Sequence, residues 1–162
     1  MKRLIIVRHA KADIQRPGGT DFDRSLCERG QSDAVKVANQ LYDTEIQPDV
    51  FICSSAKRAV ETASIFAEQY GNTTIIKKEF LYGDYNVSDI RLMLEEEAPA
   101  ANTVLIVGHN PNLSYLLAKL TGNFNQHLPT AAVVILEFDI DQWSGLRSST
   151  GIVKLFFVPK ET

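Results

Sequence analysis

Two histidines, each directly after a short apolar run, are the residues of this chain best suited to covalent chemistry. Arg8 and His9 follow the aliphatic run 4–7, and His109 closely follows the run 103–107. An unprotonated imidazole can attack phosphorus, and a guanidinium beside it can offer forked hydrogen bonds to phosphoryl oxygens. A strand that simply reaches solvent is the alternative for such a pair. The residue types indicate an anion site at which a phosphoryl group could be transferred.

Another apolar run, residues 50–53, is followed by a hydroxyl group and a further arginine. Ser54 comes directly after the run, and Arg58 is expected in the first turn of the next helix. Arginines and helix amino termini gathered at one place would favour an anion, most naturally phosphate. The alternative for Arg58 is a solvated helix residue paired with Glu61.

The elements that must position these residues alternate between strands and helices. Continuous apolar runs predict buried strands at 4–7, 50–53, 73–76, 103–107, 131–138 and 152–158, with an antiparallel pairing expected for the last two. Helices are expected at about 26–42, 56–70, 87–97 and 111–120. This order predicts an α/β fold with a mostly parallel central sheet. Because parallel strands present their carboxyl ends at one edge of a sheet, both histidines should meet there.

The expected helix starts carry capping residues. Ser25 opens the stretch "SLCE", which has the form of a capping box. Ser54 and Ser55 could cap the second helix, and Asn110 is expected as an N-cap with Pro111 in the first helical position.

The composition is that of one ordinary globular domain, residues 1–162. The chain is 44% hydrophobic and 23% charged, and its net charge of −3 disfavours a nucleic-acid binder. Cys27 and Cys53 make no disulfide framework and suggest a reducing compartment. No targeting segment is visible, and no apolar stretch approaches the roughly 20 residues of a membrane span. A cytoplasmic protein without a membrane or nucleic-acid partner is the default expectation.

Several stretches resemble motifs of the histidine phosphatase superfamily. The first strand reads "LIIVRHA", similar to a signature that usually has Arg-His-Gly, with Ala10 in the glycine position. The later stretches "SSAKRAVETA" and "VLIVGHNPNLSYLL" look like the second and third motifs. Between the first and second motifs, "DFDRSLCERG" is similar to the Asp-x-x-Arg-x-Leu and closing Gly of small members. The resemblance runs from residue 4 to about 120, and the short chain without an inserted cap domain is most similar to SixA-type phosphohistidine phosphatases.

This resemblance implies a three-layer α/β/α fold of the phosphoglycerate mutase type and a phosphatase that needs no metal or cofactor. His9 would carry a phosphohistidine intermediate, which water releases in a second step. The residues expected to bind the phosphoryl group or other parts of the substrate are Arg8, Arg58, His109, Ser54 and Arg24. The expected partner is a phosphate-bearing substrate; the sequence predicts no oligomeric state.

An ester substrate would need a general acid to protonate its leaving group. The candidates are Glu79, Asp23 and Asp84, and the fourth alternative is that the protein has no such acid. Glu79 lies roughly where larger relatives carry their catalytic Glu, but it lacks the flanking residues that would support the match. A phosphohistidine substrate makes less demand on an acid, because an imidazole protonated on its remote nitrogen leaves as a neutral group. The expectation therefore favours phosphohistidine on a protein. The alternatives are a phosphatase of small phosphate esters and a non-catalytic phosphate-binding module.

Overall fold

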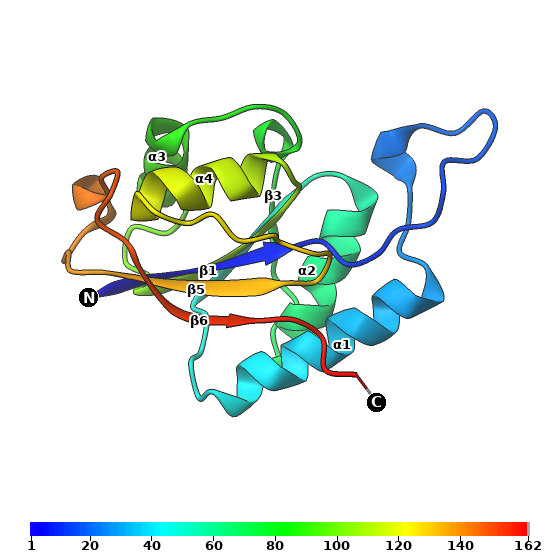
Figure 1. Ribbon diagram of the computed structural model, residues 1–162, viewed down its shortest axis with the longest axis horizontal. Helices are drawn as coiled ribbons and strands as arrows, with labels where there is room; N and C mark the ends of the chain where they lie inside the picture. The colour runs from blue at the N-terminus through cyan, green and yellow to red at the C-terminus, as the bar shows by residue number, and fades with distance from the viewer. Residues whose placement is uncertain (162) are drawn as a thin grey trace.

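The computed structural model describes residues 1–161, in which six strands form one sheet in the order β3-β2-β4-β1-β5-β6 (Figure 1). The strands are β1 Lys2–Arg8, β2 Val50–Ser54, β3 Ile76–Lys78, β4 Thr103–Gly108, β5 Val133–Phe138 and β6 Ile152–Phe157. The first four in the chain are parallel, while β5 runs antiparallel to β1 and β6 antiparallel to β5. The predicted α/β fold with a mostly parallel sheet is confirmed.

Helices cover both faces of this sheet, which gives the three predicted layers (Figure 1). Alternate side chains of β1 point to opposite faces: Ile5 and Val7 belong to the core under α1 (Glu28–Asp43) and α2 (Lys57–Gln69). Leu4 and Ile6 belong to the other core, under α3 (Val87–Glu97) and α4 (Asn112–Thr121). Burial on both faces explains the uninterrupted apolar runs. None of the helices in residues 1–161 is long and apolar enough to cross a membrane.

The strand register aligns the ends that carry the candidate chemistry. Arg8 at the end of β1 pairs with Gly108 at the end of β4, and Cys53 of β2 pairs with Val107 of β4. His9 and His109 each follow the last residue of their strand, so both imidazoles leave the sheet at its carboxyl edge.

Two expected helix starts are wrong by a few residues. Cys27, not Ser25, is the N-cap of α1, and its Sγ accepts a hydrogen bond from the backbone N–H of Gly30. Ser25 instead lies in an extended segment, where its carbonyl accepts from the N–H of Asp13. Helix α2 has Ala56 as its N-cap, with no side-chain capping bond.

The start of α4 and the position of β3 also differ from the expectation. Helix α4 begins at Asn112, with Pro111 rather than Asn110 as its N-cap. The Asn110 side chain, one residue further out, accepts from the N–H and hydroxyl of Ser114. Strand β3 lies at 76–78 rather than 73–76, since its pairing with β2 starts only at Ile76.

Candidate active site

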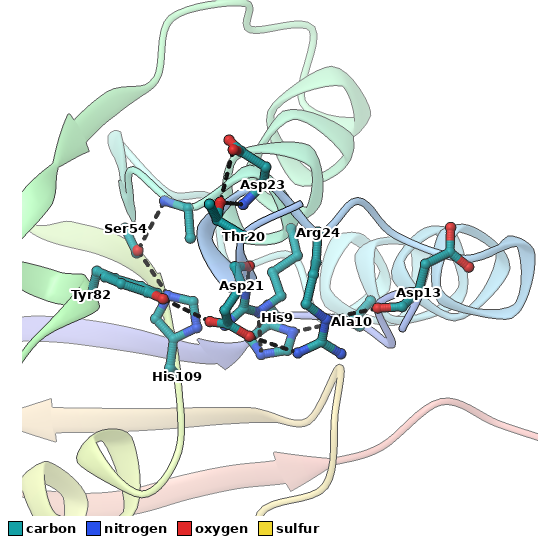
Figure 2. A network of polar contacts seen from close by, with 12 residues as sticks. His9, Ala10, Asp13, Thr20, Asp21, Asp23, Arg24, Ser54, Tyr82 and His109 are labelled. Atoms are coloured by element: carbon teal, nitrogen blue, oxygen red, sulfur yellow. Dashed lines mark hydrogen bonds and ion pairs between the residues drawn. The ribbon is translucent and has the colours of Figure 1, made fainter. Parts of the chain in front are cut away.

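The two histidines meet at the carboxyl edge of the sheet, as the strand order predicts. The ring centroids of His9 and His109 lie 5.1 Å apart, and both residues are buried. Figure 2 shows them among polar side chains contributed by β2, by the loop after β1 and by the segment before α3. Residues far apart in the chain thus form one polar cluster above the strand ends.

The backbone fixes the proton of His9. Its Nδ1 lies 2.7 Å from the carbonyl oxygen of Ala10, and only a protonated nitrogen can donate to that acceptor. The lone pair is therefore on Nε2, which receives a hydrogen bond of 3.3 Å from Nε of Arg58. Burial, together with the positive charges of Arg58 and Arg8, lowers the pKa of His9 to about 4, against the opposing effect of the Ala10 bond. The imidazole is neutral at physiological pH, which suits a nucleophile.

The hydrogen bond to Ser54 assigns the proton of His109. Its Nε2 lies 2.8 Å from Oγ of Ser54, and that oxygen already accepts from the N–H of Ala56. Among residues 1–161 the Ser54 hydroxyl has no other acceptor, so we assign its proton to the bond with Nε2, which leaves the ring proton of His109 on Nδ1. Burial, together with the nearby His9 and Arg58, lowers the pKa of His109 to about 3. His109 is therefore a neutral donor, and Ser54, fully buried, contacts this ring.

The cluster suits an anion, because it contains donor groups that have no acceptor in the protein. Within residues 1–161, Nε of Arg8 and Nδ1 of His109 are buried and have no hydrogen-bond partner. Arg8 is held in place by a 2.8 Å bond from its NH1 to the carbonyl of Leu128. A phosphoryl group offers several acceptor oxygens and need not donate a hydrogen bond, so it can accept from both of these nitrogens. No three His, Cys, Asp or Glu side chains of the described residues are grouped so as to hold a metal ion.

Arg58 is held between the nucleophile and a carboxylate. Besides its contact with His9, it donates from NH1 to the backbone oxygen of Asp21 at 2.7 Å and from NH2 to the Asp21 carboxylate at 3.0 Å. Its helix is tied to the end of β1 by Thr62, whose hydroxyl donates to the carbonyl of Arg58 and accepts from the N–H of Ala10. Ala10 is fully buried there and does not have a positive φ, so alanine fits the position where glycine is usual.

Asp21 is a residue of this cluster that the sequence reasoning missed. It lies in the 3-10 turn η1 (Asp21–Asp23), and its carboxylate accepts from Arg24 at 2.9 Å and from the Tyr82 hydroxyl at 2.7 Å. These two bonds, together with Arg58, hold the pKa of Asp21 well below its usual range. A signal existed, since Asp21 is the first residue of the Asp-x-x-Arg-x-Leu stretch that ends with Arg24 and Leu26.

Tyr82 is a second residue of the cluster that the sequence reasoning missed, and for this residue no sequence signal existed. It ends the 3-10 turn η2 (Glu79–Tyr82) and packs edge-on against the His109 ring, with centroids 5.4 Å apart. Its ring also meets Phe22 edge-on at 5.1 Å. The Tyr82–Asp21 hydrogen bond thus joins η1 and η2 beside the two histidines (Figure 2).

The structure does not bring the candidate acids into contact with the histidines. Glu79 is exposed at the start of η2 and has no hydrogen bond or ion pair to the cluster among the described residues. Asp23 accepts from the Thr20 hydroxyl, and Asp84 from the Asn112 side chain. Among the described residues, Arg24 bonds to the cluster through the Asp21 carboxylate, and its Nε donates to the Asp13 carbonyl outside the cluster.

Comparisons with known proteins agree with this geometry. The model of the Histidine phosphatase superfamily (branch 1) matches residues 4–89. The Agrobacterium tumefaciens protein assigned as the phosphohistidine phosphatase SixA is 24% identical, with a TM-score of 0.80 and coverage of 98% of this chain and 99% of that one. The protein histidine phosphatase SixA complexed with tungstate is 18% identical, with a TM-score of 0.77 and 97% of each chain covered. The 5''-phosphoribostamycin phosphatase of Niallia circulans is 35% identical over 85 residues, which are 49% of this chain and 39% of that protein.

Proposed function

The chain belongs to the histidine phosphatase superfamily, and from that premise we propose that it is a phosphatase acting through a phosphohistidine intermediate on His9. We propose phosphohistidine carried by a protein as its substrate class. The neutral His9 with its lone pair on Nε2, and the unpartnered donors of Arg8 and His109, support the proposed mechanism.

In the first step, Nε2 of His9 attacks phosphorus. A bond forms between phosphorus and Nε2, and the bond to the leaving nitrogen breaks with its electron pair going to the substrate imidazole. The transition state of phosphoryl transfer spreads charge over the nonbridging oxygens. Arg58, Arg8 and Nδ1–H of His109 are the donors that would stabilise this charge. Nε of Arg8 and Nδ1 of His109 have no protein acceptor to give up before they do so.

In the second step, water attacks the phosphorylated His9. The water oxygen bonds to phosphorus, the phosphorus–Nε2 bond breaks, and its electron pair returns to the imidazole. A proton of the water is lost to solvent, and inorganic phosphate leaves. Because the Ala10 carbonyl keeps the proton on Nδ1, the ring returns directly to the reactive tautomer.

The hydrogen bonds that the Asp21 carboxylate accepts from Tyr82, Arg24 and Arg58 are the observation that carries the choice of substrate. Among residues 1–161 Asp21 is the only carboxylate bonded to Arg58, and its pKa is depressed rather than raised. A general acid that protonates an alkoxide would need the opposite shift. An imidazole that already bears a proton on its remote nitrogen leaves without such an acid.

The open rim of the cluster supports a substrate presented by another protein. The Asp21 side chain is 42% exposed, and Tyr82 is also exposed. We propose that the chain is a single phosphatase domain, residues 1–162, without an inserted cap over this rim. A phosphorylated side chain on a protein surface could then reach His9.

Parallel assays test this proposal. The purified protein would be mixed with a phosphohistidine-bearing protein and, separately, with p-nitrophenyl phosphate, both with a metal chelator present. We expect faster phosphate release from the phosphohistidine protein. Release from the ester alone would overturn the substrate class and favour small phosphate esters, the kind of substrate named for the Niallia circulans relative. Phosphate binding without release from either substrate would overturn the enzymatic proposal in favour of a binding module.

A further inference from the structure

Asp21 accepts hydrogen bonds from both terminal nitrogens of Arg58, the arginine that also contacts the nucleophile His9. The backbone oxygen of Asp21 accepts from NH1 of Arg58 and its carboxylate accepts from NH2, while Nε of the same guanidinium donates to His9. Such paired contacts are those that a guanidinium makes with a phosphoryl group. A negatively charged side chain of the protein therefore competes for the donors that a substrate phosphate would use.

Burial indicates on which side of the phosphoryl group Asp21 lies. The side chain of Arg58 is 7% exposed and that of Asp21 is 42% exposed, and the hydrogen bonds run from His9 through Arg58 to Asp21. An incoming phosphoryl group approaches the buried Nε2 from the open side. In an in-line displacement the leaving group points away from the nucleophile, and so toward the rim where Asp21 and Tyr82 lie.

An ionised carboxylate at this rim affects different leaving groups in opposite ways. It repels the dianionic phosphate and competes with it for Arg58, which weakens the binding of any phosphate ester. The remote N–H of a phosphorylated imidazole is a donor that the carboxylate can accept. That contact favours the protonated imidazole, which departs as a neutral group. Tyr82 and Arg24 keep the carboxylate in place for this contact.

We propose that Asp21 is a specificity-determining residue, which selects phosphoryl groups carried on imidazole nitrogen over those carried on oxygen by accepting the N–H of the leaving ring. This inference rests on the proposed function, because it concerns the leaving group of the same reaction. The covalent step is unchanged: the phosphorus bond passes from the substrate nitrogen to Nε2 of His9, and the departing imidazole keeps the proton that Asp21 faces.

The test compares Asp21→Asn with Asp23→Asn, a neighbouring exposed carboxylate whose side-chain partner is Thr20. Three measurements would be made on each protein: the Kd for inorganic phosphate, and kcat/KM for a phosphohistidine-bearing protein and for p-nitrophenyl phosphate. In Asp21→Asn we expect tighter phosphate binding and a roughly tenfold loss of kcat/KM on phosphohistidine, the size expected for one charge-assisted hydrogen bond. The ester kcat/KM should hold or rise, and Asp23→Asn should behave like the unaltered protein.

Two results would overturn the role of Asp21. One is an equal loss on both substrates in Asp21→Asn, which would indicate a general structural effect. The other is phosphate binding that is unchanged or weaker in that variant. Failure of the proposed function has a different signature, because the unaltered protein would then not release phosphate from phosphohistidine. In that case a tighter phosphate Kd in Asp21→Asn would still support the competition for Arg58, and an unchanged Kd would refute it.

Discussion

His9 is buried as a neutral ring, and this has a consequence for stability against pH. Its pKa in the folded chain is about 4 against an ordinary value of 6.5, so between these values the unfolded chain binds more protons. The stabilisation present above pH 6.5 is therefore lost as the pH falls toward 4. Between pH 7 and 5 we expect the unaltered protein to lose about 2 kcal/mol more unfolding free energy than His9→Ala. Urea denaturation of both proteins at the two pH values measures this, and equal losses would contradict a neutral buried His9.

The Ser54 hydroxyl is predicted to hold His109 in the tautomer that donates from Nδ1. In Ser54→Ala the ring loses its only hydrogen-bond partner among the described residues. We expect kcat to fall about tenfold with a smaller change in KM, because the donor acts mainly on the transition state. Nitrogen NMR should show a loss of the Nδ1–H form of His109. An unchanged tautomer together with an unchanged kcat would rule out this role of Ser54.

At the scale of the elements, the close contact between α1 and the segment after His9 positions the nucleophile. A Cβ on Gly30, in the first turn of α1, would overlap the backbone oxygen of Lys11. Gly30→Ala should therefore cost about 1–3 kcal/mol of unfolding free energy and reduce kcat/KM, since Lys11 must move. Gly83→Ala is the matched control, because its new Cβ would lie 3.8 Å from the nearest atom outside its chain neighbours. Urea denaturation and kcat/KM measure both effects, and equal stability of the two variants would contradict this packing.

The meeting of the histidines could be predicted from the sequence, because it depends on element type alone. Continuous apolar runs identify buried parallel strands, and the carboxyl ends of such strands share one edge; His9 and His109 follow from these two rules. Asp21 and Tyr82 depend instead on how two loops fold back over that edge. No periodic pattern in the sequence encodes this path, and so Glu79 and Asp23 were considered while Asp21 was not.

At the scale of the whole molecule, the site joins elements from both layers of helices. Arg58 comes from α2 on one face of the sheet, and Tyr82 from the segment that leads to α3 on the other. An anion bound among them should stabilise the complete fold. We expect inorganic phosphate at about 100 times its Kd to raise the unfolding free energy by about 2.7 kcal/mol. Thermal denaturation with and without phosphate measures the effect. If the same phosphate concentration raised the unfolding free energy of Arg58→Ala by an equal amount, the bound phosphate would lie elsewhere.

The central claim is that His9 carries the phosphoryl group. The most direct measurement is to mix the protein with a phosphohistidine-bearing substrate, stop the reaction in alkali and locate the modification by mass spectrometry. We predict an acid-labile, alkali-stable phosphoryl group on the peptide that contains His9, and none on that peptide in His9→Ala. Phosphate release without a label on His9, or turnover that survives in His9→Ala, would contradict the account.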